Sequence, residues 1–597
     1  MRLKERLREA MPYLYAAAGY LVLALVCTWP IVEELRERVI GIDIPSPDIE
    51  GALWVHWWVR YAIENHLNMN VCPLIYFPVG KNVLIHIGNL AEGVAALPFY
   101  YAFGFPAYYN ILCIVLMAFN GVAMFALFRR FTGDWYTAFL GGFVAAFNWY
   151  FFREVQDGHI CCIATGLLAL YVLFLLKVIE EERWEHGVIL ALVLAANCLW
   201  YWFFGVFLAL FTILFLPLYY YAERGRFAPG AARRLAFSAV LFLVVILPFA
   251  ATFLNYLRLE KTLPGTTFFE AFPPLSEVFG NLAHTDPRKL TLGNSVSLDS
   301  ELLAYPYVLL LVGGLLPLFR IKESGYYWVV LWVFMFSLVS GPYLYVAGEF
   351  HGIRMPFAYL YQFFPMFSRL NFPKRLVVMA LIPMGILFVK NMEWIKGLIK
   401  ERFRWVWPFL MGILVVLTCA EFYWVKGQIP MDSKEISIPQ VFHVLAREPD
   451  CALIEVPFLC CSKSMLYQTV HHKKLMGGLG EPATWLHSPD FVQFYKSNTF
   501  LEYLLGLNDL NTPPYATFKK EDLEALTARG FKYVIFYKGY TGEVAIRTLG
   551  YSNPTVQEEI ATRIKTAMES NFGAPIYRDE NLAIYRMAKK EKNSLGK

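Results

Sequence analysis

Carboxylates and aromatic rings gather in one stretch near the amino terminus, residues 41–64. Asp48 follows Pro47 and stands at the start of a predicted helix, with Asp43 and Glu50 close to it in the chain. An Asp at this place can serve only as the N-cap of the helix, because its carboxylate accepts hydrogen bonds from the orphan backbone amides. It can also serve as the acid–base group of a site, and other segments of the chain are needed to separate these two roles.

The helix after Asp48 is predicted to lie along a membrane surface. Its aromatic residues recur at the spacing of one helix face and its ionisable residues fall on another, namely Trp54, Trp57, Trp58 and Tyr61 against His56, Arg60 and Glu64. We expect such a helix to place its rings at the boundary between acyl chains and headgroups, with its charges towards water.

Three basic residues form a second candidate group within a span of seven positions: Arg369, Lys374 and Arg375. An Arg side chain pairs with two phosphate oxygens at once, and Lys supplies a compact charge. Basic residues at a helix end often only reach for the membrane surface. These three lie on the side opposite the other basic clusters of the chain, which favours a role in a site.

Three further residues are candidates for the same cleft: Asp157 and His159, in the sequence Asp-Gly-His, and His86. A His at a helix end is as often a capping or packing residue as a site residue. No H-x-x-x-H or D-x-D pattern indicates a metal site, so a divalent cation is compatible with the sequence but not required by it. No organic cofactor is expected.

The composition of the chain is that of a membrane protein. Of its 597 residues 57% are hydrophobic and 17% charged, and the mean hydropathy is +0.44. Soluble proteins average about 45–50% apolar and about 25% charged residues. This excess excludes a soluble enzyme and a disordered scaffold, and a net charge of +5 excludes a nucleic-acid partner. The lipid bilayer is therefore the first partner of the chain.

Eleven apolar runs are long enough to be candidate membrane spans, at residues 12–32, 107–128, 135–151, 160–178, 187–203, 204–222, 235–256, 302–320, 326–346, 372–391 and 404–425. Basic clusters occupy the connections of one parity, which places them and the amino terminus in the cytoplasm. Residues 83–103 are also apolar, but a crossing there would reverse every later loop. We predict a re-entrant or interfacial segment at 83–103, with thirteen spans as the alternative, in a bacterial inner membrane.

The composition changes after Val425. Residues 430–597 contain short β-rich stretches around 451–456, 533–537 and 582–585, and an amphipathic run at 555–570 that is predicted to be a helix. We therefore predict a membrane domain over 1–429, whose first external loop is 33–106, and an extracytoplasmic α/β domain over 430–597. Cys451, Cys460 and Cys461 of this domain leave a disulfide open.

Several motifs together resemble the GT-C superfamily of polytopic glycosyltransferases, and in particular a large bacterial group of similar membrane proteins. In the first loop an Asp is followed by Trp at six residues, Trp-Trp at nine and ten and Arg at twelve, then by Phe-Pro-x-Gly-x-Asn at 77–82. Later matches are Phe147-Asn148-Trp149-Tyr150, Gly158-His159, Glu301 with Tyr305, Gly341-Pro342, the stretch 355–375 and residues 467–478 with His471 and His472. The likeness covers most of the chain, although this chain has Pro47-Asp48 where the group usually has Gly-Asp.

The resemblance implies transfer of a sugar from a polyprenyl-phosphate donor to an extracytoplasmic glycan, lipid or protein hydroxyl. In such enzymes an acidic residue of the first external loop acts as general base or helps to hold a divalent metal. By position that residue is Asp48, with Asp43 second and Glu50 as another nearby carboxylate. Arg369, Lys374 and Arg375 would then bind the lipid phosphate, with Arg60, Asp157, His159 and His86 as further substrate-binding candidates.

Two other functions remain open at the level of the sequence. A transporter or flippase for an amphipathic lipid predicts charges at the membrane midplane and inverted repeats, and neither is evident. A non-catalytic envelope-assembly protein with the same fold is the second alternative, and it is kept open by the missing Gly before Asp48.

Overall fold

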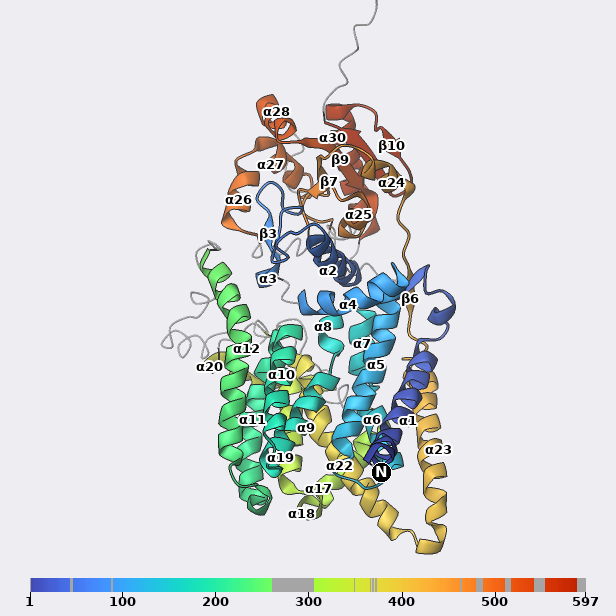
Figure 1. Ribbon diagram of the computed structural model, residues 1–597. Coiled ribbons are helices and arrows are strands. Elements are labelled where there is room, and N and C mark those ends of the chain that lie inside the picture. The colour runs from blue at the N-terminus through green and yellow to red at the C-terminus, as the bar shows by residue number, and fades with distance from the viewer. Residues whose placement is uncertain are drawn as a thin grey trace, which may run out of the picture. The chain divides into compact units, whose positions relative to one another are not determined.

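The structure is a computed structural model, and it describes residues 2–42, 47–86, 90–259, 305–347, 349–364, 367, 370, 373–461, 464–478, 487–509, 517–541 and 553–587 (Figure 1). The chain forms two compact units. Unit 1 comprises Met1–Ile44, Ala95–Ala251 and Phe272–Ile436, and unit 2 comprises Pro45–Val94, Thr252–Ala271 and Ser437–Lys597. Each unit is described below by itself.

Unit 1 is built almost entirely from helices. Its long helices are α1 (Arg2–Thr28), α5 (Ala107–Phe128), α9 (Gly166–Glu180), α11 (Trp202–Ala222), α12 (Ala231–Leu259), α22 (Val377–Leu398) and α23 (Trp407–Ala420). Shorter ones are α6 (Trp135–Ala146), α7 (Trp149–Gln156), α8 (Ile160–Ile163), α10 (Trp184–Trp200), α19 (Tyr326–Val339) and α20 (Pro356–Phe363). Helices α9, α10 and α11 lie side by side in a row (Figure 1). Strand β1 (Arg38–Ile40) pairs antiparallel with β6 (Ser433–Glu435).

Each of the eleven predicted apolar runs overlaps a helix, although 135–151 is divided between α6 and α7, and 326–346 ends in strand β4 (Tyr343–Val346). In the described part of the chain, seven helical stretches are long and apolar enough to cross a membrane, and four further apolar helices are shorter: Trp135–Ala146, Trp184–Trp200, Tyr307–Phe319 and Tyr326–Val339. The stretches around α5, α9 and α22 are mostly buried inside the unit, whereas those around α1, α12 and α23 expose most of their apolar side chains. Exposed apolar faces of this extent need an apolar solvent, so the chain is a multi-pass membrane protein.

The apolar run at 83–103 forms two short helices, α3 (Val83–His86) and α4 (Leu90–Phe103). A span needs about 20 residues of helix, and neither of these reaches that length. Residues 87–89 between them lie outside the described part of the chain, so the re-entrant or interfacial segment stays a prediction. The sidedness of the membrane and the number of crossings stay predictions.

Unit 2 contains a mixed five-stranded sheet with the strand order β10-β11-β9-β7-β8. The central strands β7 (Ala452–Val456) and β9 (Phe531–Tyr537) are parallel, and β11 (Leu582–Arg586) runs antiparallel to β9. The edges are β8 (Lys474–Leu475) and β10 (Tyr577–Arg578), and helices α24 (Gln440–Ala446), α25 (Ser464–His471), α26 (Pro489–Lys496), α27 (Thr499–Gly506), α28 (Lys520–Ala528) and α30 (Pro554–Phe572) belong to the same unit. The predicted strands and the predicted helix at 555–570 are confirmed.

Helix α2 (Pro47–Glu64) corrects the prediction for the first loop. Its aromatic stripe is buried in the hydrophobic core of unit 2, where Trp54 and Trp58 are fully buried and Trp54 Nε1 donates a 2.7 Å hydrogen bond to Gln468 Oε1 of α25. His56 is not turned to water either, because it is buried with its Nε2 atom 3.2 Å from Glu92 Oε1. The membrane-surface interpretation of this helix is therefore wrong. A wide aromatic face needs an apolar partner, and the core of the α/β part supplies it.

All ten cysteines are free thiols, so the disulfide left open by the sequence does not form in this structure. Cys451, Cys460 and Cys461 are buried.

The packing of α2 predicts a large loss of stability for Trp54→Ala. Truncating a fully buried Trp costs about 3–5 kcal/mol, because a cavity forms and the surrounding contacts are lost. The change also leaves Gln468 Oε1 without its indole donor. We expect thermal unfolding of the detergent-purified chain, followed by tryptophan fluorescence, to shift to clearly lower temperature. Trp405→Ala is the matched control, since Trp405 is 67% exposed; equal shifts for both variants would contradict the packing described here.

Candidate functional site

A buried carboxylate is the centre of the site in unit 1. Glu154 of α7 is only 1% exposed, and its Oε2 atom lies 2.9 Å from His159 Nδ1. Two basic side chains approach the same carboxylate, with Lys374 Nζ 3.9 Å from Oε1 and Arg375 Nε 3.7 Å from Oε2. One buried negative charge therefore stands beside two positive charges and an imidazole.

Local chain geometry brings His159 back onto Glu154. Helix α7 follows the N-cap Asn148, whose side chain accepts from Phe151 N, and it ends at Gln156, two residues before Gly158. Gly158 has a φ of +86°, a conformation that closes the helix end and lets His159 N donate a 2.8 Å bond to Glu154 O. The Asp-Gly-His sequence is thus a helix-terminating turn that folds an imidazole over the preceding carboxylate.

The next corner of the chain is fixed by α5. Asn120 donates a 2.7 Å hydrogen bond to Ile163 O and accepts a 2.7 Å bond from Gly166 N. These two bonds satisfy backbone groups at the break between α8 and α9, which have no hydrogen-bond partner within either helix. Helix α5 is itself mostly buried in the unit, so these bonds tie the segment after His159 to a packed helix.

The two basic residues lie at the amino-terminal end of a helix. Lys374 and Arg375 belong to the single turn Pro373–Leu376, which leads directly into α22. Positive side chains are disfavoured there, because the helix dipole already places partial positive charge at that end. Arg375 is held by a 2.9 Å hydrogen bond from its Nη1 atom to the Tyr201 hydroxyl, and both basic side chains are 15% exposed. The arrangement keeps a strong positive potential beside a single buried carboxylate.

The electrostatics of Glu154 follow from these contacts. Burial on its own would raise the pKa of the Glu154 carboxyl. The hydrogen bond from His159 and the charges of His159, Arg375 and Lys374 outweigh burial, and they hold the pKa of Glu154 below its ordinary value. Glu154 is accordingly ionised at neutral pH.

Several predicted site residues come together in unit 1. His159, Lys374 and Arg375 surround Glu154 as described. Asp157 faces its neighbour on the same turn, because its Oδ2 atom accepts a 2.9 Å hydrogen bond from Arg153 Nε. Arg369 lies outside the described residues.

The candidates from the first loop belong to unit 2. Asp48 is exposed in the first turn of α2, whereas Glu50, one half-turn later, is 2% exposed. Arg60 Nη1 lies 3.7 Å from Glu64 Oε1 on the same helix. The backbone of His86 ends α3, but its side chain lies outside the described residues, as does Asp43.

The histidines at the end of α25 have a structural role. Burial lowers the pKa of His471 to about 3, so its ring is neutral and its Nδ1 atom accepts a 2.9 Å hydrogen bond from Lys473 N. Burial also lowers the pKa of His472, which packs against Trp57 and Tyr61.

Sequence reasoning named the neighbours of Glu154 and Tyr201 but not these two residues. A usable signal for Glu154 exists, because a carboxylate stands among Phe151, Phe152 and Val155 at the end of an apolar run. A charge in such a setting needs a partner. Tyr201 offers no comparable signal, since it is one of 36 tyrosines.

A metal site is not evident among the residues that the structure describes. No group of three or more His, Cys, Asp or Glu side chains there is arranged to hold a metal ion. A divalent cation therefore stays a prediction of the sequence.

Comparison with known proteins identifies the fold. No protein-family model and no curated protein matches the sequence. Among solved structures, the chain is similar to the oligosaccharyltransferase of Archaeoglobus fulgidus in the apo form, with a TM-score of 0.50 and 12% identity over 92% of this chain and 72% of that chain. A second structure of that enzyme, AglB, in complex with an inhibitory peptide and a dolichol-phosphate has a TM-score of 0.46 at 11% identity over 95% and 73% of the two chains. ArnT from Cupriavidus metallidurans bound to undecaprenyl phosphate has a TM-score of 0.42 at 12% identity over 96% and 97%. The chain thus shares the fold of the Archaeoglobus fulgidus oligosaccharyltransferase.

The ion cluster predicts a pH-dependent stability that Glu154→Gln removes. Since the pKa of Glu154 is lowered in the folded chain, its contribution is complete above its ordinary value of about 4.5 and is lost as the pH falls through the lower folded value. At pH 7 the variant should be less stable by about 3–5 kcal/mol, because two basic groups lose their buried counter-charge.

We expect this difference to shrink as the pH falls below about 4.5 in unfolding curves of the purified chain. Glu401→Gln is the control, because Glu401 is 80% exposed and pairs only at the surface with Arg404. A stability difference between wild type and Glu154→Gln that does not change with pH would contradict an ionised, paired Glu154.

Proposed function

We propose that this protein is a membrane glycosyltransferase that moves a sugar from a polyprenyl-phosphate donor to an extracytoplasmic hydroxyl of a glycan, lipid or protein. The observation that carries the proposal is the convergence of Lys374 and Arg375 on the buried Glu154 at the start of an apolar helix. The GT-C fold is consistent with this activity, and so are the motifs of the first loop.

Two basic side chains that meet at one place favour an anionic ligand. Lys374 Nζ and Arg375 Nε lie 3.9 Å and 3.7 Å from the Glu154 carboxylate. They stand at the amino-terminal end of α22, where backbone amides and the helix dipole also favour an anion. A phosphate group suits this place, because its oxygens can accept hydrogen bonds from both basic side chains.

The membrane setting favours a lipid as the bearer of that phosphate. Lys374 and Arg375 stand where an apolar helix of 26 residues, Pro373–Leu398, begins. A phosphate bound at this place lies at the end of a membrane-spanning stretch, where the headgroup of a lipid would be. This position therefore favours a lipid-linked donor over a soluble nucleotide sugar.

The proposed reaction assigns a role to each side chain. The acceptor oxygen attacks the anomeric carbon of the donor and loses its proton to a carboxylate, while the bond between that carbon and the phosphate oxygen breaks. The electron pair of this bond leaves with the lipid phosphate, and Lys374 and Arg375 bind the charge that develops. Glu154 and His159 act as positioning residues, since they hold the two cations in place.

Asp48 is the proposed general base. It is exposed at the start of α2, so a hydroxyl can reach it, whereas Glu50 is buried. Asp43, which lies outside the described residues, stays second. An ordinary carboxylate is a weak base, and positioning against the acceptor has to supply its effect. Arg60, Asp157 and His86 stay secondary substrate-binding candidates, together with Arg369.

Replacing Arg375 tests the phosphate-binding role. A hydrogen bond to a charged group contributes about 1.5–3 kcal/mol, so Arg375→Gln should lower kcat/KM for a lipid-linked sugar roughly 10- to 150-fold. The readout is transfer of labelled sugar in membranes that contain the chain. Arg404→Gln is the matched control, because Arg404 pairs at the surface with Glu401. Unfolding curves of Arg375→Gln separate loss of function from loss of fold, and unchanged transfer by a folded variant would overturn the assignment.

Replacing Asp48 tests the general base. Asp48→Asn keeps the size of the side chain but removes its basicity, and kcat should fall by about 10²–10⁴ with little change in stability. Glu64→Gln, near the other end of the same helix, is the control and should keep full activity. If Asp48→Asn transfers sugar as fast as wild type, Asp48 is not the general base.

A further inference from the structure

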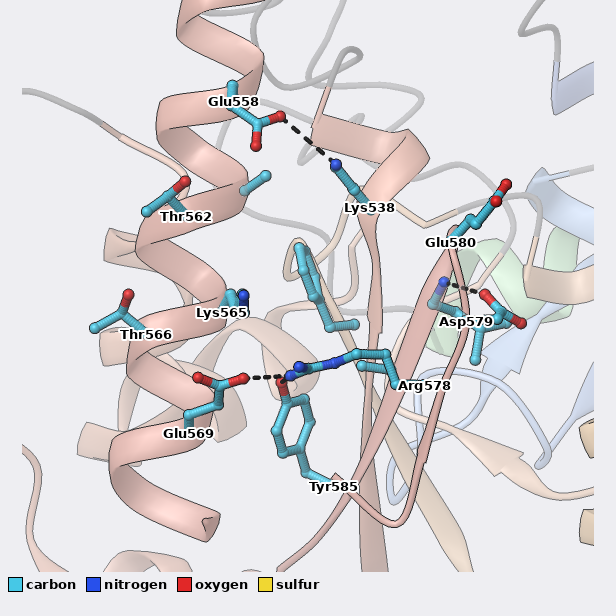
Figure 2. Close-up of a pocket in the computed structure, with 14 residues that line it drawn as sticks. Lys538, Glu558, Thr562, Lys565, Thr566, Glu569, Arg578, Asp579, Glu580 and Tyr585 are labelled. Carbon is cyan, nitrogen blue, oxygen red and sulfur yellow. Dashed lines mark hydrogen bonds and ion pairs between the residues drawn. The ribbon is translucent and has the colours of Figure 1, made fainter. Parts of the chain in front are cut away.

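A cleft with a volume of about 420 Å³ lies in unit 2, between helix α30 and the strands β9, β10 and β11 (Figure 2). Its size falls in the range of about 300–1,000 Å³ that is usual for ligand pockets. The floor is apolar and comes from the sheet, with Phe536, Leu582 and Ala583. The proposed transfer reaction gives this cleft no role.

Two ion pairs join the walls of the cleft and hold α30 against the sheet edge. Lys538 Nζ, just after β9, lies 3.7 Å from Glu558 Oε2 near the start of α30. About three turns further along the helix, Glu569 pairs with Arg578 of β10 (Figure 2). Arg578 Nη2 also donates to the Tyr585 hydroxyl at 3.4 Å. The cleft is therefore braced at both ends.

The charges of the lining nearly cancel. Three basic side chains, Lys538, Lys565 and Arg578, face four acidic ones, Glu558, Glu569, Asp579 and Glu580. Asp579 is engaged by its own turn, because its Oδ1 atom accepts from Asn581 N and Leu582 N at 2.8 Å each. Among the described residues Lys565 and Glu580 take part in no ion pair, and they leave one cation and one anion available to a ligand.

This lining suits a ligand that is neutral and rich in hydroxyl groups. An anion such as phosphate needs a surplus of positive charge, which is absent here, and a simple cation gains little because the three basic groups offset all but one of the four acidic groups. A hydroxyl both donates and accepts, so it can bond to Lys565 and to Glu580, and to the hydroxyls of Thr562 and Thr566 that also line the cleft. The C–H faces of a sugar ring can lie on the apolar floor.

We propose that this cleft binds a neutral saccharide segment, with Lys565 and Glu580 as the groups that bond to its hydroxyls. The inference deepens the proposed function, on which it rests, because it names a glycan as the acceptor class. Binding here holds the acceptor glycan on unit 2 at a place apart from the hydroxyl that reacts. The cleft thereby selects the acceptor, while transfer depends on other residues.

Saturation-transfer difference NMR on the full chain in detergent tests the proposal. The probes are neutral trisaccharides of glucose, of mannose and of N-acetylglucosamine. We expect ring-proton signals for at least one of them, and a loss of at least tenfold in affinity for Lys565→Met. Lys520→Met is the matched control, since Lys520 of α28 is 84% exposed, lies outside the cleft and should leave binding unchanged. Thr562→Trp, compared with Thr555→Trp outside the cleft on the same helix, provides a second pair.

The outcomes separate this proposal from the proposed reaction. Saccharide binding that survives Arg375→Gln but is lost in Lys565→Met supports the cleft whether or not transfer is detected. If no trisaccharide gives a signal, or if Lys565→Met and Lys520→Met bind equally, the cleft is not a saccharide site. Binding only of phosphorylated sugars would overturn the proposal too, because it would require the positive surplus that the lining lacks.

Discussion

The buried carboxylate of Glu154 imposes the strictest physical constraint on unit 1. A charge that is 1% exposed in a helical membrane unit is tolerated only when other charges and donors compensate for it. Four segments meet this demand: α7 carries the carboxylate, the turn at Gly158 returns His159, the residues before α22 bring Lys374 and Arg375, and Tyr201 between α10 and α11 holds the guanidinium. Segments distant in the chain are therefore fixed to one another by a single charge.

Unit 2 depends on a different interaction, the burial of the aromatic face of α2. The segment that follows the first long helix supplies Trp54, Trp58 and further apolar residues up to Leu90 to a core whose remaining members come from the last third of the chain. The indole of Trp54 bonds to Gln468, and the Gln468 amide donates in turn to Leu74 O and Lys473 O. The first loop and the carboxy-terminal residues therefore fold as one body. The orientation of Asp48 at the start of α2 is a property of that shared core.

The sequence predicted the elements better than their contacts. Hydropathy and length were sufficient for the apolar helices, and alternation was sufficient for β7, β9 and β11, because these features depend on nearby residues. The partner of the aromatic face of α2 was predicted wrongly, because the same sequence pattern suits a helix that faces lipid and a helix that faces a protein core. Lys374, Arg375 and His159 were found by their residue types, but Glu154 was not. A single carboxylate can be recognised as a site residue only when the fold brings cations to it. Here the two basic residues lie more than 200 residues away in the chain.

The two cations of the cluster also match the course of the proposed reaction. A sugar donor linked through a phosphodiester carries a single negative charge. Departure of the sugar leaves a phosphomonoester, whose charge approaches two because its second pKa is about 6. Lys374 and Arg375 thus face a more negative group as the bond breaks. Their attraction for phosphate grows towards the transition state, which is the direction that accelerates a reaction. In the proposed reaction Glu154 contributes by holding these two cations in place.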